Sequence, residues 1–103
     1  MKNFSELGLS EAVAIAIAEL GFEKPTPIQS QVIPAMLESA KDLIALAQTG
    51  TGKTAAFGIP LVELIDTSAK KPQALVLAPT RELCVQIEND LKAFRLKQNT
   101  FIP

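Results

Sequence analysis

The chain has 103 residues, a length that accommodates one domain at most. Its 48% hydrophobic and 20% charged residues form an ordinary globular balance, which excludes a disordered chain. Ten basic and eleven acidic residues give a net charge of −1, and the lack of any histidine excludes histidine metal sites and a Ser-His-Asp triad.

The first predicted element is a helix between Ser10 and Gly21. Ser10 is a good N-cap and Gly21 a good residue just past a helix end. Alternating Val13, Ile15 and Ile17 would also suit a strand, but the caps and the alanine content favour a helix.

A second helix is predicted to begin at Pro27. Thr26 and Gln29 form a Thr-x-x-Gln capping box with proline at the first helical position. The helix is expected to run to about residues 32–33, where Pro34 kinks it. Two uses compete for the Gln29 amide, because its neighbouring donor and acceptor also match adenine N7 and N6. Similarly, Phe22 either stacks on a base or packs in the core.

The next segment predicts a strand, a phosphate-binding loop and a helix. Residues 43–47 are a short apolar run suited to a buried strand, and A-Q-T-G-T-G-K-T follows at positions 47–54. Glycines at positions 50 and 52 let backbone N–H groups approach phosphate oxygens, and the helix that begins near Lys53 directs its positive end at the same place. Lys53 supplies a cation and the Thr54 hydroxyl suits Mg²⁺. The alternative is a surface helix that happens to begin with Gly-Lys-Thr.

A second buried strand is predicted at residues 74–78, followed by a helix capped by Thr80. Leu83, Ile87, Leu91 and Phe94 would share one face of that helix. The capped terminus with Arg81 is suited to a phosphate, although this segment alone is better explained as an ordinary cap with a surface arginine.

The order of these elements predicts an α/β fold with parallel strands flanked by helices. The single cysteine, Cys84, is expected to pack in the core. Because it has no partner for an internal disulfide, and no apolar run is long enough to span a bilayer, we predict a cytoplasmic protein.

Three segments in this order resemble the DEAD-box RNA helicases. The Q motif reads G-F-E-K-P-T-P-I-Q and is preceded by the aromatic Phe4, 17 positions before Gly21. Motif I reads A-Q-T-G-T-G-K-T, with the alanine at position 47 that is usual for this family, and motif Ia reads P-T-R-E-L. The resemblance covers nearly the whole chain.

The resemblance implies an ATP-dependent RNA helicase with ATP and Mg²⁺ as cofactors. Phe22 and Gln29 would recognise adenine. The phosphates and the metal would be held by Gly50, Thr51, Gly52, Lys53 and Thr54. The RNA sugar-phosphate backbone would be contacted by Pro79, Thr80 and Arg81, which predicts poor sequence selectivity.

The resemblance also implies an incomplete RecA-like P-loop domain, with a Q-motif region at 1–40 and the phosphate-loop and motif Ia units at 41–103. The sequence contains no Asp-Glu-Ala-Asp or Ser-Ala-Thr motif, so we expect the 103-residue chain not to hydrolyse ATP. In the family's sheet the two predicted strands are not neighbours. The chain is therefore expected to rearrange, to swap elements with a copy of itself, or to remain partly disordered. The alternatives are a non-catalytic nucleotide-binding module, a self-associating module and a small P-loop phosphotransferase.

Overall fold

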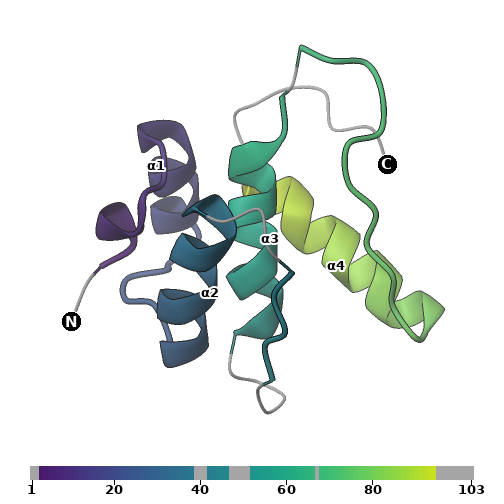
Figure 1. Cartoon of the computed structure of the whole chain (residues 1–103), viewed down its shortest axis with the longest axis horizontal. Helices are drawn as coiled ribbons and strands as arrows, with labels where there is room; N and C mark the ends of the chain where they lie inside the picture. Colours follow the sequence, from purple (N-terminus) through teal and green to yellow (C-terminus); the bar gives the residue numbers. More distant parts are fainter. Residues whose placement is uncertain (1–2, 39–41, 47–51, 67, 95–103) are drawn as a thin grey trace.

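The computed structural model describes residues 3–38, 42–46, 52–66 and 68–94, and these form a group of packed helices (Figure 1). In chain order the helices are η1 (Phe4–Leu7), α1 (Glu11–Glu19), α2 (Pro27–Glu38), α3 (Lys53–Leu64) and α4 (Arg81–Phe94). The central helix is α3, which packs against α2 on one side and α4 on the other (Figure 1). Helix α1 packs against α4 and α3, and η1 contacts both α1 and α2.

The predicted helix ends are confirmed where side chains cap the backbone. Ser10 Oγ accepts a hydrogen bond from the Val13 N–H at 3.4 Å, and Gly21 ends the first helix with a φ of +93°. The hydroxyl of Thr80 accepts from the Leu83 N–H at 3.1 Å at the beginning of α4. These contacts satisfy N–H groups that a helix leaves without partners at its first turn.

The expected end of this helix near residues 32–33 is wrong, because α2 continues through Pro34 to Glu38. Proline removes one helix hydrogen bond. Ile33 is fully buried, and Leu37 packs against the same core one turn later. We infer that the burial of these side chains on both sides of the proline offsets the lost bond.

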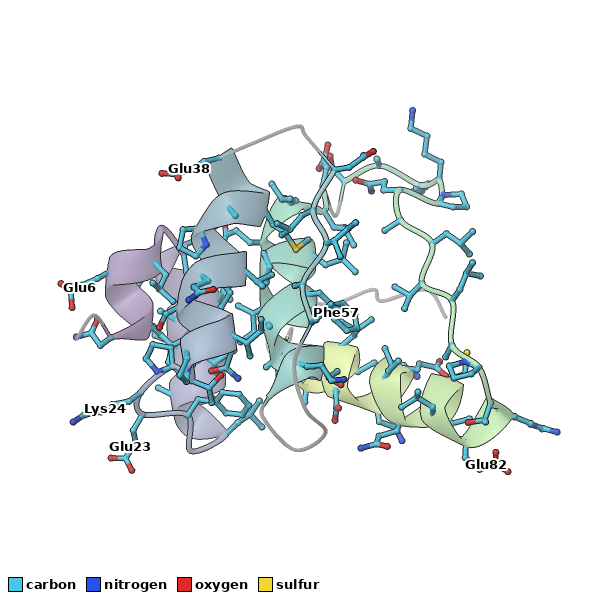
Figure 2. All side chains as sticks on the ribbon, turned by 60° about the horizontal axis from the view of Figure 1, so that its bottom comes forward. Glu6, Glu23, Lys24, Glu38, Phe57 and Glu82 are labelled. Atoms are coloured by element: carbon cyan, nitrogen blue, oxygen red, sulfur yellow. The ribbon has the colours of Figure 1, made fainter. Side chains whose placement is uncertain are left out.

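The core lies where α1, α2, α3 and α4 meet. Its most deeply buried aliphatic side chains are Ile17, Ile33 and Ile59, one from each of the first three helices. The contact of α3 with α4 is close, since a Cβ on Gly58 would lie 2.9 Å from Leu91 Cδ2. Charged side chains such as Glu6, Lys24 and Glu82 point outward into solvent (Figure 2).

The two apolar segments predicted as buried strands are largely exposed, although Val76 and Ala78 are partly buried against the core. Ile44 and Leu46 are 87% and 88% exposed, and Leu75 and Leu77 are 83% and 84% exposed. Neither segment is part of a strand within the described residues, and position 47 lies outside them. A strand requires a hydrogen-bonding neighbour. The exposure agrees with the expectation that these two segments do not pair with each other.

The expected burial of Cys84 is also wrong, since its side chain is exposed. Cys84 shares a helix face with Leu91 by spacing. However, the amino-terminal half of α4 extends beyond α3, so α3 does not cover that face there (Figure 1). Val85, next to it, is 48% exposed as well.

The turn that follows α3 is held by side chains from its two flanks. The Gln73 amide accepts from the Asp66 N–H at 2.9 Å and donates to the Asp66 carbonyl at 2.8 Å. The hydroxyl and the N–H of Ser68 both donate to the Asp66 carboxylate, and these bonds lower the pKa of Asp66. The turn therefore fixes how the chain leaves α3.

Candidate nucleotide-binding site

The end of the predicted phosphate loop forms the amino terminus of α3. Gly52 precedes the helix with a φ of +85°, a backbone conformation that favours glycine. Lys53 is exposed at the first helical position, and Thr54 follows as a partly buried residue. The first N–H groups of a helix lack intrahelical partners, so they are available to an anion. Two other predicted site residues, Gly50 and Thr51, lie outside the described residues.

The capping box predicted for α2 is formed by Thr26 and Gln29. The Thr26 N–H donates to Gln29 Oε1 at 2.9 Å, and the Gln29 N–H donates to Thr26 Oγ1 at 3.3 Å. Gln29 is buried, with 3% of its surface exposed. Its amide is thereby held in one orientation at the edge of the loop.

The same amide also reaches the phosphate loop. Gln29 Nε2 donates to the Gly52 carbonyl at 3.2 Å, which joins α2 to the beginning of α3. A carboxamide offers two N–H donors and two acceptor positions. The two observed side-chain bonds use one of each, so one donor and one acceptor remain. Capping and adenine recognition are therefore compatible at Gln29.

The loop and α2 approach each other so closely that a Cβ at position 52 would displace the Gln29 side chain. A Cβ built at Gly52 would collide with Gln29 Nε2 and would lie 3.3 Å from Thr26 Oγ1. Gly21 also has a positive φ, but a Cβ there would meet nothing within 4 Å. The two glycines thus share a conformation and differ in their surroundings.

Phe22 lies in the connection between α1 and α2 and is partly buried. Its ring centroid is 5.9 Å from that of Phe4 and 6.0 Å from that of Phe94, and the second pair meets edge to face at 84°. Of the two uses considered for Phe22, packing against the core is observed. The ring also borders the cleft described next, so packing leaves part of it accessible.

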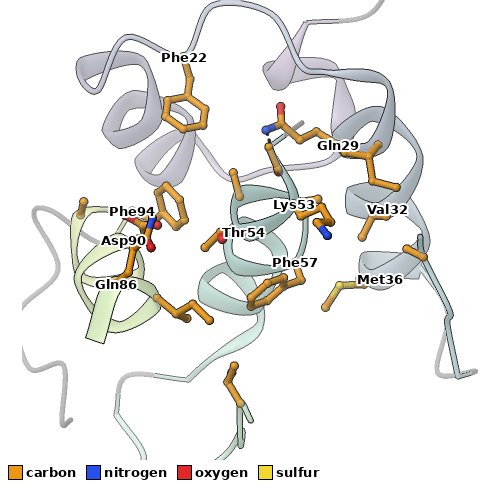
Figure 3. Close-up of a pocket in the computed structure, with 18 of the residues that line it drawn as sticks. Phe22, Gln29, Val32, Met36, Lys53, Thr54, Phe57, Gln86, Asp90 and Phe94 are labelled. Carbon is orange, nitrogen blue, oxygen red and sulfur yellow. Dashed lines mark hydrogen bonds between the residues drawn. The ribbon is translucent and has the colours of Figure 1, made fainter. Parts of the chain in front are cut away.

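A single cleft of about 1170 Å³ brings together the predicted base-recognising and phosphate-binding residues (Figure 3). It is bordered by Phe22 and Gln29 and by the first turn of α3 with Gly52, Lys53 and Thr54. Segments far apart in the sequence thus face the same space. Ligand clefts commonly combine apolar walls with a few convergent polar groups, as here.

The predicted RNA-contacting residues do not border this cleft. Pro79, Thr80 and Arg81 are exposed at the amino end of α4, and that end lies away from α2 (Figure 1). The use of Thr80 as a cap is confirmed. The amino terminus of α4 is therefore separate from the cleft, whereas the amino terminus of α3 borders it.

Sequence reasoning missed the contribution of α4 to the cleft. Gln86, Asp90 and Ala93 line it from the opposite side to Gln29 (Figure 3). Their spacing of four and three residues places them on one helix face, beside the apolar one. The spacing is visible in the sequence, but the sequence does not show that this helix face borders a cleft.

The comparisons with known proteins agree with this arrangement. The sequence pattern of the DEAD/DEAH box helicase family matches residues 26–101. The DEAD-box ATP-dependent RNA helicase CshA of Geobacillus kaustophilus is 56% identical over 91 residues, which are 88% of this chain and 19% of that protein. The chain therefore spans about a fifth of the length of the curated relatives it matches.

Solved structures give the same result for the fold. The crystal structure of a DEAD box protein from the hyperthermophile Methanococcus jannaschii matches with a TM-score of 0.90 and 44% identity, over 94% of this chain and 26% of that one. Saccharomyces cerevisiae Dbp5, solved with RNA and ADP BeF3 bound, matches with a TM-score of 0.89 and 36% identity, over 93% and 25%. Within the described residues, no helix is both long and apolar enough to cross a bilayer. The matched segment and these likenesses establish that the chain belongs to the DEAD/DEAH box helicase family.

Proposed function

We propose that this chain is the nucleotide-binding front part of the first RecA-like domain of an ATP-dependent RNA helicase. One observation carries the proposal: the buried Gln29 amide donates a hydrogen bond to the Gly52 carbonyl at the end of the predicted phosphate loop. This contact supports a base-reading role for Gln29 beside the phosphates. In this proposal Gln29 reads adenine with its remaining donor and acceptor, and Phe22 packs against the base.

The phosphate end of ATP would lie at the amino terminus of α3. Free N–H groups of the first turn and the Lys53 ammonium would attract its oxygens. The Thr54 hydroxyl borders the cleft in the first turn of α3, and hydroxyl and phosphate oxygens are the hard ligands that Mg²⁺ takes. Thr54 therefore fits as a ligand to a nucleotide-bound Mg²⁺, with Gly50 and Thr51 completing the loop.

RNA would be contacted by Pro79, Thr80 and Arg81 through its sugar-phosphate backbone. Support comes from the exposed amino terminus of α4 and from the related Dbp5, which was solved with RNA bound. Phosphate contacts carry little sequence information, so we expect weak selectivity among RNAs. RNA binding and ATP binding both fit a cytoplasmic protein.

A titration of ATP against the Lys53→Ala variant tests the phosphate site. We expect at least tenfold weaker binding, because the variant removes the cation from a site built for an anion. Lys70→Ala is the matched control, since it removes the same charge from an exposed turn. Equal ATP affinity in the Lys53→Ala variant and the parent would refute the assignment of the phosphate loop.

A second function, self-association, is favoured by the exposed apolar segments at 42–46 and 73–78. Exposed extended chain with unpaired N–H and C=O groups is a template for pairing with another copy. In a longer chain the same two segments would be parallel strands of the RecA-like sheet. Sedimentation equilibrium of the 103-residue chain tests this proposal, and a monomer at all concentrations would contradict it.

A further inference from the structure

Phe94 lies where α4, α3 and the connection that carries Phe22 meet. It is the last residue of α4, and only 4% of its surface is exposed. On one side a Cβ built on Gly58 of α3 would lie 3.1 Å from Phe94 Cε2, so the ring rests directly on the α3 backbone. On another side it meets the Phe22 ring at 6.0 Å and 84°. Its position is thus fixed by α3.

The Phe22 ring, by contrast, comes from a connection without regular structure. The Phe22 N–H donates to the Ile17 carbonyl at 3.1 Å, which fixes the backbone. The orientation of the side chain depends on what the ring contacts, and its two aromatic contacts among the described residues are Phe4 and Phe94. Edge-to-face pairs have a preferred geometry because the ring edge is positive and the face negative.

The three rings differ in where they stand relative to the cleft. Phe22 and Phe94 both border it, next to each other, whereas Phe4 does not (Figure 3). A base that packs on Phe22 therefore meets a ring whose tilt is set from the cleft side by Phe94. The sequence gives no sign of this contact, because Phe94 is 72 positions after Phe22 and lies outside the Q motif.

We propose that Phe94 is a positioning residue that sets the tilt of the Phe22 ring and thereby the affinity for the purine base. The inference rests on the proposed nucleotide site and assigns a role in it to the carboxyl end of α4. Phe94 acts on the base through Phe22 and leaves the phosphate end of the site unchanged.

Titration calorimetry with two probes, ATP and inorganic tripolyphosphate, separates the base from the phosphates. We expect Phe94→Leu to weaken ATP binding roughly threefold to tenfold, the range of a single aromatic pair, and to leave tripolyphosphate binding unchanged. Phe94→Tyr keeps the ring and is expected to retain the parent's ratio of the two affinities. Leu91→Ala is the control, because Leu91 also packs on Gly58 one turn earlier and is buried.

The outcomes are distinguishable. A parent chain that binds neither probe overturns the proposed function and this inference together. If the parent prefers ATP over tripolyphosphate and Phe94→Leu keeps the same ratio of the two affinities, this inference alone is overturned. An equal change of the ratio in Leu91→Ala would also overturn it, because the effect would then follow general packing. Helical circular dichroism is measured for each variant, and Phe94→Met replaces Phe94→Leu if the leucine variant loses its helices.

Discussion

The contact between Gly52 and Gln29 makes a sharp prediction about the Gly52→Ala variant. Two costs add at this position. A residue with a Cβ in the left-handed region loses roughly 1–2 kcal/mol, and the φ of Gly52 is +85°. In addition, the new methyl group would displace the Gln29 amide from the Gly52 carbonyl, because it collides with Nε2. Leaving a buried amide without its partner costs about 1–3 kcal/mol.

Gly21→Ala isolates the first of these costs. Its φ is +93°, and a Cβ there meets nothing within 4 Å, so only the conformational cost applies. We therefore expect urea unfolding to show a loss of about 1–2 kcal/mol for Gly21→Ala. The loss for Gly52→Ala should be larger by roughly 1–3 kcal/mol.

A double-mutant cycle assigns the excess to Gln29. In a Gln29→Ala background the amide is gone, so Gly52→Ala should cost no more than Gly21→Ala. Equal losses for the two glycine variants in the parent would refute the close contact. An excess that persists in the Gln29→Ala background would show that another neighbour, such as Thr26, is responsible.

Four further outcomes are expected. Gln29→Glu keeps the capping oxygen but loses the N–H donor. A preference of the parent for ATP over GTP of about 1–3 kcal/mol should therefore disappear in competition titrations. A parent without that preference would show that Gln29 acts as a cap only. Thr80→Ala should cost about 1 kcal/mol in urea unfolding because the Leu83 N–H loses its acceptor, and unchanged stability would contradict the role of the cap. Alanine favours helices over glycine by about 1 kcal/mol. Gly58→Ala should nevertheless destabilise the chain, because its Cβ would press on Leu91 and Phe94 of α4. A variant more stable than the parent would contradict this. The 103-residue chain should show no RNA-stimulated phosphate release, because it has no Asp-Glu-Ala-Asp motif to position Mg²⁺ and water. RNA-stimulated release by the parent chain that is absent from the Lys53→Ala variant would refute this prediction.

The sequence by itself determined where most of the helices begin. Ser10, Thr26 and Thr80 cap the helices at which they were predicted, because a hydroxyl satisfies N–H groups only two or three residues away. The beginning of α3 at Lys53 also follows from local sequence. Gly52, the residue before the helix, adopts the left-handed backbone conformation that glycine favours. The motifs and their order likewise predicted the family that the comparisons show.

Only the tertiary structure decided which side chains are covered and which distant groups meet. Cys84 and Leu91 occupy the same face of α4, yet one is exposed and the other buried, because α3 covers only the carboxyl end of that helix. The bond of Gln29 to the Gly52 carbonyl and the contact of Phe22 with Phe94 likewise join segments with no local signal for each other. Burial and long-range contact depend on the neighbours that a fold supplies, and a stretch of sequence specifies its own backbone preference but not those neighbours.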